Sequence, residues 1–182
     1  MIKSLLLACV VLVTGCSPVS GTAPALPAKT GSRLPVAQHL TVYPVTSRQQ
    51  TPSAPFTTER GEAVTLQQFA GQVVVLHLWA TWCNPCVHEM PLLDRLAAEM
   101  PSVEIVPISV DVLAEKAVTF FQRQLLQHLG AYHDPDGRLM RELGAYALPM
   151  SFVMDRQGRI AAVAKGSVDW NSEAIRKLLA SI

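Results

Sequence analysis

The sequence predicts an α/β fold in which helices flank a central mixed sheet, and three observations lead to this class. Val73–Trp79 is an almost unbroken apolar run, too short to span a membrane and typical of a strand buried on both faces. Directly after it, the apolar positions 87, 90, 93, 97 and 100 follow helical spacing. Patterns typical of strands and helices then alternate to the end of the chain.

Short elements are expected on both sides of this strand and helix. Residues 56–66 predict a hairpin, and residues 66–70 predict a short helical turn that ends at Gly71. Residues 103–111 predict a strand, in which Pro107 lacks a backbone donor, so we expect a bulge or local distortion there. Residues 114–129 predict a helix that ends at Gly130.

The C-terminal third contains the remaining elements. Residues 134–137 predict a turn, and residues 138–143 a short helix closed by Gly144. Residues 150–155 and 160–165 predict a hairpin. Asn171 or Ser172 is expected to cap the last helix. The expected order is therefore β-α-β-α-β-β-α.

Two cysteines at the start of the helix after the central strand indicate redox chemistry. Cys83-Asn84-Pro85-Cys86 lies on the first turn, where free backbone N–H groups and the helix dipole favour a thiolate. Cysteine pKa values fall from about 8.5 to roughly 3.5–7.5 in such motifs. A thiolate can attack a disulfide, and a thiol one turn away can resolve the mixed disulfide. We assign Cys83 as the nucleophile and Cys86 as the resolving thiol.

A structural disulfide and a metal site are the alternatives for this pair. So small a loop removes little entropy from the unfolded chain, which argues against a structural role. Zinc sites usually need a second Cys/His pair, and the mature chain offers no further cysteine within the fold. We therefore expect no metal.

Composition limits the class of partner. The 182 residues suit one domain with extensions, and 15 Lys and Arg against 14 Asp and Glu give no electrostatic case for binding nucleic acid. The sequence has no motif for a flavin, a nicotinamide or a haem. We expect no cofactor beyond the Cys83–Cys86 disulfide, so electrons must come from another protein.

The N-terminus predicts export and lipidation. Residues 1–15 combine Lys3 with an apolar stretch at 5–13, as in a signal peptide, and residues 13–16 resemble a lipoprotein cleavage site. Cys16 would then carry the lipid. An uncleaved membrane anchor and ordinary signal cleavage remain alternatives. Residues 16–54 are rich in proline and predict a tether, within which 40–45 is compatible with a short strand added to the domain at 55–182.

Three stretches resemble one protein family. "LWATWCNPCVHEMP", "ALPMSFVMDRQGRI" and "GSVDWNS" are similar to the membrane-tethered, extracytoplasmic thioredoxin-like proteins of the TlpA/ResA type. The resemblance runs from about residue 55 to the end. It implies a thioredoxin-like fold with an N-terminal hairpin and a central insertion.

The resemblance also implies roles for single residues. Pro149 matches a cis-proline facing the cysteines, which would leave the Leu148 backbone free to pair with a client peptide. The alternative is a trans turn proline. Glu89 matches an acid that tunes the cysteines, rather than a solvated carboxylate. His77 is either a core histidine or a proton acceptor for Cys86.

Other residues near the cysteines have weaker assignments. Trp82 is expected on the docking surface, whereas Asp169-Trp170 is given a structural role. His88, Met90 and Met150 are candidates for a soft copper site, although the two methionines are better explained as packing residues.

These observations predict an extracytoplasmic thiol:disulfide oxidoreductase that reduces client disulfides. The expected clients are apocytochrome c, a copper-site assembly factor or a similar protein, and the electron donor a membrane thiol protein. The alternatives are a copper-binding chaperone for respiratory oxidase assembly and an oxidase that donates disulfides.

Overall fold

The computed structural model describes residues 40–182, which lie within one of the two compact units of the chain. The predicted signal peptide at 1–15, the lipid site at Cys16 and the tether up to residue 39 lie outside the described residues. Three of the sequence-based predictions therefore remain predictions: export, lipidation and an extended tether.

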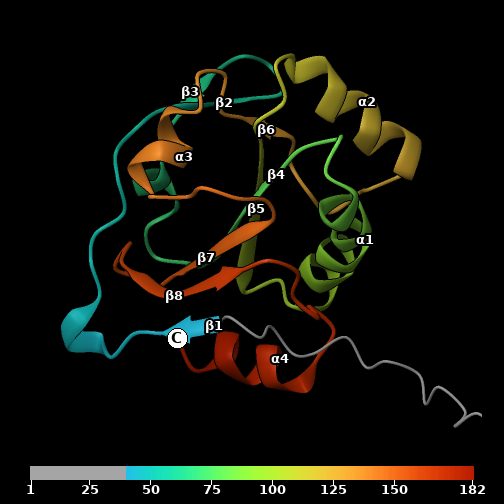
Figure 1. Cartoon of the computed structure of the whole chain (residues 1–182). Helices are drawn as coiled ribbons and strands as arrows, with labels where there is room; N and C mark the ends of the chain where they lie inside the picture. The colour runs from blue at the N-terminus through green and yellow to red at the C-terminus, as the bar shows by residue number, and fades with distance from the viewer. Residues whose placement is uncertain (1–39) are drawn as a thin grey trace, which may run out of the picture. The chain divides into compact units, whose positions relative to one another are not determined.

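A mixed eight-stranded sheet forms the centre of the described structure (Figure 1). Its order is β1-β8-β7-β4-β5-β6-β2-β3. The central strand β4 pairs in parallel with β5 and antiparallel with β7, which confirms the predicted α/β class with a mixed sheet. The strands are β1 (Leu40–Val42), β2 (Phe56–Thr58), β3 (Ala63–Val64), β4 (Val73–Trp79), β5 (Val103–Ser109), β6 (Tyr132–His133), β7 (Met150–Met154) and β8 (Ile160–Lys165).

The helices follow the predicted order. They are α1 (Asn84–Glu99), α2 (Ala114–Gln124), α3 (Arg138–Glu142) and α4 (Glu173–Ala180), with 3-10 turns at Val45–Ser47 and Leu66–Phe69. Ser172 is the cap of α4, and its hydroxyl accepts a hydrogen bond from the Ile175 amide. Between α2 and β7 the chain adds β6 and α3, which are the insertion in the predicted order.

The end of α2 differs from the prediction. The helix stops at Gln124, because Leu125 takes a left-handed conformation with φ of 54°. The Leu126 amide then donates to the Phe121 carbonyl, which closes the last turn. Glycine normally takes such a position, so a rule that searches for glycine placed the end too late, at Gly130.

The predicted distortion at Pro107 is also wrong. β5 pairs with β4 without a register shift, and Pro107 lies opposite His77. The Ser109 carbonyl accepts from the Asp134 amide on the β6 side, so Pro107, two residues earlier, faces the same side. β6 begins to pair only at Ile108, so no strand lies beside Pro107 on that side. The sheet therefore loses no backbone hydrogen bond at this proline.

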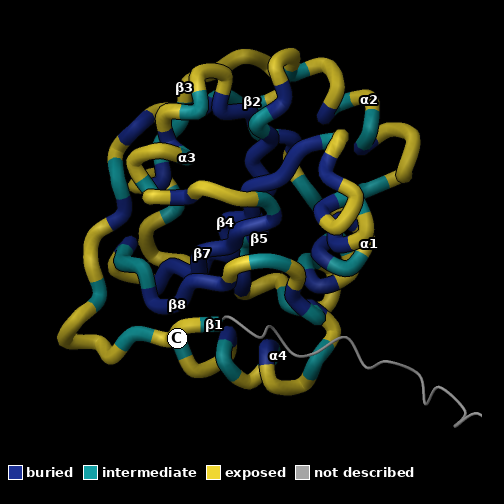
Figure 2. The backbone as a smooth tube through the Cα atoms, viewed as in Figure 1, coloured by how far each residue is buried: buried dark blue, intermediate teal, exposed yellow. Residues whose placement is uncertain are grey.

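Two apolar clusters cover the two faces of the sheet, and Figure 2 shows the sheet strands as the buried centre. Alternation along β4 divides its side chains between them: Val73, Val75 and Trp79 pack with α1, α2 and α4. The residues between them pack with β2, α3 and the 3-10 turn at Leu66–Phe69. His77 alternates toward the α1 face, which places a polar ring in an apolar layer.

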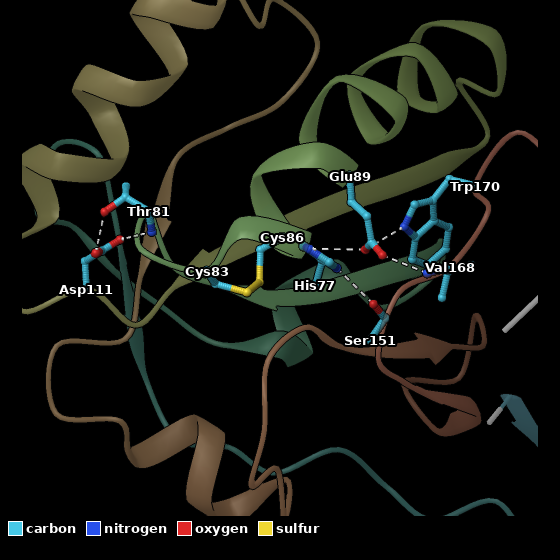
Figure 3. The surroundings of a disulfide bond; sticks show 9 residues. All are labelled: His77, Thr81, Cys83, Cys86, Glu89, Asp111, Ser151, Val168 and Trp170. Carbon is cyan, nitrogen blue, oxygen red and sulfur yellow. Dashed lines mark hydrogen bonds and ion pairs between the residues drawn. A yellow bond between two sulfur atoms is a disulfide. The ribbon is translucent and has the colours of Figure 1, made fainter. Parts of the chain in front are cut away.

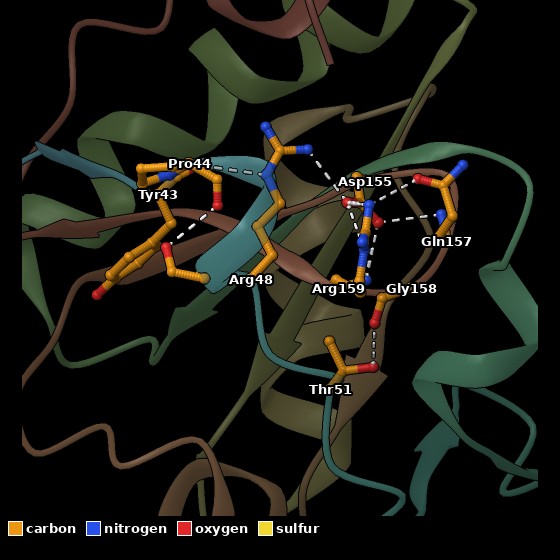
Figure 4. Close-up of polar contacts among 9 residues, drawn as sticks. Tyr43, Pro44, Arg48, Thr51, Asp155, Gln157, Gly158 and Arg159 are labelled. Carbon is orange, nitrogen blue, oxygen red and sulfur yellow. Dashed lines mark hydrogen bonds and ion pairs between the residues drawn. The ribbon is translucent and has the colours of Figure 1, made fainter.

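Residues 40–54, which we call the strap, pack on the sheet instead of extending away. β1 pairs antiparallel with the edge strand β8, as the possible strand at 40–45 suggested. Arg48 donates to the Asp155 carboxylate at 3.1 Å, and the Thr51 hydroxyl donates to the Gly158 carbonyl (Figure 4). The packed structure therefore includes residues that the sequence assigns to the tether.

Candidate active site

The two cysteines lie where β4 passes into α1, and they form a disulfide (Figure 3). Cys83 is the cap residue of α1 and is 6% exposed, whereas Cys86, on the first turn, is completely buried. The Cys83 amide donates to the Ala80 carbonyl, which folds the connecting loop into a tight turn. An incoming disulfide can therefore reach only Cys83.

A buried carboxylate fixes this loop. Asp111, just after β5, accepts hydrogen bonds from the Thr81 amide at 2.9 Å and from the Thr81 hydroxyl at 2.7 Å. The Ser109 hydroxyl donates to the same carboxylate, and a ring nitrogen of His133 lies 2.7 Å from the Asp111 carbonyl oxygen. The carboxyl ends of β4, β5 and β6 are thus joined close to the loop that carries Cys83.

Glu89 lies on α1, one turn after Cys86, and is only 3% exposed. Its Oε1 accepts the Val168 amide at 2.7 Å, and its Oε2 accepts the Trp170 indole N–H at 3.2 Å. Burial raises the pKa of Glu89, and these two hydrogen bonds oppose the rise because they favour the anion. The alternative of a solvated helix carboxylate is therefore wrong.

His77 is fully buried beside Glu89. Its Nδ1 lies 2.9 Å from the Ser151 hydroxyl, and its Nε2 lies 3.7 Å from Glu89 Oε2. That second distance is too long for a hydrogen bond. Burial lowers the pKa of His77 to about 3, so the ring is neutral near pH 7 and the close approach is not an ion pair.

An open groove of about 680 Å³ lies beside Cys83. Trp82 and Tyr146, which also line it, are 68% and 71% exposed. Leu148 lines the groove as well, and the Leu148–Pro149 peptide bond is cis, as the sequence resemblance implied. The full lining is Trp82, Cys83, Asn84, Pro85, Val110, Gly137, Met140, Tyr146, Ala147 and Leu148.

The candidate copper residues do not come together. Met90 is fully buried in the cluster on the α1 face, whereas Met150 packs in the cluster on the opposite face of the sheet. His88 is exposed on α1. The two methionines therefore pack in separate clusters, as expected of packing residues.

Sequence reasoning missed three residues that contact the site. Trp170 was given only a structural role, yet its indole N–H binds Glu89. Ser151 is a polar residue inside a buried strand and lies opposite His77 in the β4–β7 register. Asp111 comes two residues after the end of β5, at the edge where β4 also ends. For Ser151 and Asp111, the available signal in the sequence was a polar residue within or next to a strongly apolar strand.

Among residues 40–182, no helix is long and apolar enough to cross a membrane.

Comparison with known proteins agrees with this arrangement. Residues 48–163 match the AhpC/TSA family. The chain is 31% identical to the thiol-disulfide oxidoreductase ResA of Bacillus thuringiensis over 120 residues, which are 65% of this chain and 69% of that protein. It is also 31% identical to the thiol:disulfide interchange protein DsbE of Yersinia pestis, over 58% of this chain and 56% of that protein.

The fold comparison gives the same result. A secreted thiol-disulfide isomerase from Corynebacterium glutamicum superposes with a TM-score of 0.63 at 28% identity, covering 74% of this chain and 86% of that one. The chain therefore belongs to the AhpC/TSA family, in the group of thioredoxin-like thiol-disulfide oxidoreductases of the ResA and DsbE type.

Proposed function

We propose that this protein reduces disulfides of client proteins outside the cytoplasm, held at the membrane by a lipid on Cys16. The observation that carries the proposal is the unequal exposure of the two cysteines beside an open groove. Cys83 lines the groove and is 6% exposed, whereas Cys86 does not line it and is completely buried. The signal-like residues 1–16 and the secreted relative support the location.

The cycle moves two electrons from this protein to the client. The Cys83 thiolate attacks one sulfur of the client disulfide, and the other client sulfur leaves as a thiolate. The Cys86 thiolate then attacks Cys83, which releases the second client thiolate and forms the Cys83–Cys86 disulfide. A membrane thiol protein must return both electrons. The client must carry a disulfide that can be reduced, and apocytochrome c and copper-site assembly factors are the client classes we propose.

Cys86 must lose its proton before the second attack, and Glu89 is the better acceptor of the two candidates. Burial makes a charged imidazole at His77 costly and so lowers its pKa to about 3. The raised pKa of Glu89 instead favours proton uptake by its carboxylate. His77 then serves as a neutral polar neighbour whose ring is held by Ser151.

The residues around Cys83 favour a reductase over a donor of disulfides. A dithiol becomes oxidising when its reduced form is unusually stabilised, for example by positive charge near the thiolate. Neither Asn84 nor Pro85 is cationic, and the buried Glu89 adds negative charge. We expect a reduction potential nearer about −270 mV than about −120 mV. Equilibration with glutathione or dithiothreitol measures it, and a value above roughly −170 mV would contradict the reductase assignment.

Trapping tests the roles of the two cysteines. Cys86→Ser should accumulate a mixed disulfide between Cys83 and the client, because the resolving thiol is missing. Cys83→Ser is the matched control and should trap little, since Cys86 is buried. Non-reducing gels followed by mass spectrometry read out both. Equal trapping by the two variants would reverse the assignment of nucleophile.

A further inference from the structure

We propose that Trp170, together with the Val168 amide, is a positioning element that prepares Glu89 to take the proton of Cys86. This proposal rests on the proposed function, because Glu89 acts there as the proton acceptor. The loop between β8 and α4 is remote in sequence from the cysteines. The proposal makes this loop one of the elements that set the rate at which Cys86 resolves the mixed disulfide.

The contacts are specific to the two carboxylate oxygens. The Val168 amide donates to Oε1 and the Trp170 indole N–H donates to Oε2 (Figure 3). Val168 is 4% exposed and Trp170 is 1% exposed, so water does not replace these donors. Each oxygen of Glu89 therefore accepts a hydrogen bond from this loop, which orients the carboxylate.

The loop that carries both donors is itself held in place. The Trp170 amide donates to the Val168 carbonyl, and the Asn171 amide donates to the Asp169 carboxylate. The Ser172 hydroxyl donates to the Asp169 carbonyl just before α4 begins. The indole is thus presented by a closed turn, which explains why this short segment can orient a side chain on α1.

Among the described residues, two ionisable side chains lie next to Glu89 in the site: His77 and Cys86. His77, on β4, faces its Oε2 from 3.7 Å, and Cys86 lies one turn earlier on α1. The loop also carries Asp169, whose carboxylate accepts a hydrogen bond from the loop's own Asn171 amide. The Trp170 ring also meets His77 edge-on, with centroids 6.3 Å apart. Hydrogen bonds from the Trp170 indole, the Val168 amide and the Ser167 side chain therefore favour the ionised carboxylate against the effect of burial.

Removal of the indole N–H should make Glu89 harder to ionise. A hydrogen bond to a charged group contributes roughly as much as one to two pKa units of preference for the anion. In Trp170→Phe the pH at which Cys86 becomes competent to resolve should therefore rise by about one to two units. The first attack, by Cys83 at the groove, should keep its pH dependence.

Trp79→Phe is a matched control. Trp79 is also completely buried, but its indole nitrogen has no hydrogen-bond partner among the described residues. The two substitutions remove the same atoms from a packed interior, and only one removes a bond to Glu89. Any loss caused by packing alone should appear in both variants.

Single-turnover reaction of the reduced protein with dithionitrobenzoate separates the two steps. The first release of thionitrobenzoate reports attack by Cys83, and the second reports resolution by Cys86. Measured against pH, the midpoint of the second phase should rise in Trp170→Phe and stay within a few tenths of a unit of wild type in Trp79→Phe. Equal shifts in the two variants would overturn the proposal.

Nuclear magnetic resonance gives a second readout, because a change in packing alone does not make a signal move with pH. The Trp170 indole N–H signal, assigned by its loss in Trp170→Phe, should move with pH at the midpoint of the second phase. The movement should disappear in Glu89→Gln. An indole signal that ignores pH in the wild-type protein would also overturn the proposal.

Glu89→Gln distinguishes a failure of this proposal from a failure of the proton role itself. If Glu89→Gln leaves the second phase unchanged, the carboxylate does not serve Cys86 and the role of Trp170 falls with it. If Glu89→Gln slows that phase while Trp170→Phe behaves like Trp79→Phe, only the positioning role is lost. In the double variant Glu89→Gln/Trp170→Phe the midpoint shift should be absent.

Discussion

His77 is a neutral imidazole enclosed in an apolar layer, and its burial lowers the free energy of unfolding at acidic pH. Its pKa falls from 6.5 in the unfolded chain to about 3 in the folded protein. Between these values the unfolded state binds a proton that the folded state does not. The stabilising contribution is therefore fully present above pH 6.5 and is lost as the pH falls toward 3.

We predict that His77→Asn makes the free energy of unfolding less sensitive to acid. The wild-type protein should lose stability by up to about 1.4 kcal/mol per pH unit through this one group between pH 6 and pH 4. His77→Asn should lack that loss, so the gap between the two proteins should narrow as the pH falls. Urea unfolding of the oxidised proteins at several pH values measures this.

His88→Asn is the control for this comparison, because His88 is exposed on α1 and is not buried on folding. Glu89 works in the opposite direction: its raised pKa stabilises the fold as the pH falls, and it is present in all three proteins. A constant gap between wild type and His77→Asn over the whole range would contradict the prediction.

At the scale of elements, the ends of three strands are tied together by Asp111. The Thr81 hydroxyl donates to its Oδ1 at 2.7 Å, and this bond holds the loop that carries Trp82 and Cys83. The connection matters because the loop has no secondary structure between Trp79 and Asn84 to hold it. The position of the nucleophile Cys83 thus depends on the side chain of Asp111, which follows the neighbouring strand β5.

We predict that Thr81→Val destabilises the protein by about 1.5–3 kcal/mol, since it removes a hydrogen bond to a buried charged group while preserving side-chain shape. The backbone N–H of residue 81 can still donate to Asp111. The Cys83 phase of the dithionitrobenzoate reaction should slow as well, because the loop is less well fixed. Thr119→Val, at an exposed position on α2, should change stability by less than about 0.5 kcal/mol. Equal effects of the two substitutions would rule out the loop-holding role.

At the scale of the whole described structure, the strap is held by charge as well as by the β1–β8 pairing. Burial alone would raise the pKa of Asp155, but hydrogen bonds from Arg159 and Arg48 outweigh it, and the pKa is lowered below 3.8. Stability from this network is therefore present at neutral pH and is lost as the pH falls through the lowered value.

We predict that Arg48→Ala lowers the free energy of unfolding at pH 7 by about 1.5–3 kcal/mol, since Asp155 has no exposed surface and Arg48 also donates to the Tyr43 carbonyl. Protease cleavage within residues 40–54 should become faster. Lys177→Ala, which removes an exposed ion pair with Glu173, should cost no more than about 0.5 kcal/mol and leave cleavage unchanged. Cleavage at the wild-type rate in Arg48→Ala would show that the remaining contacts, β1 pairing among them, hold the strap without this ion pair.

The sequence by itself determined the parts of this protein that depend on neighbours along the chain. A continuous apolar run specified β4, helical spacing specified α1, and their junction placed Cys83 at a helix N-terminus with Cys86 one turn further. Local hydrogen bonding and side-chain periodicity decide such features, because each requires only residues within a few positions. Glycine as a helix-end signal failed at Leu125, where a residue with a side chain took the left-handed position.

Only the tertiary structure decided which distant residues complete the site. Glu89 receives its donors from positions 79 and 81 residues further along the chain. Ser151 meets His77 through the register of two strands, and Asp111 reaches Thr81 because two parallel strands end at the same edge. Pro107 is tolerated because β6 is short. These contacts depend on strand register and on how α1 and the β8–α4 loop pack, which no local pattern in the sequence specifies.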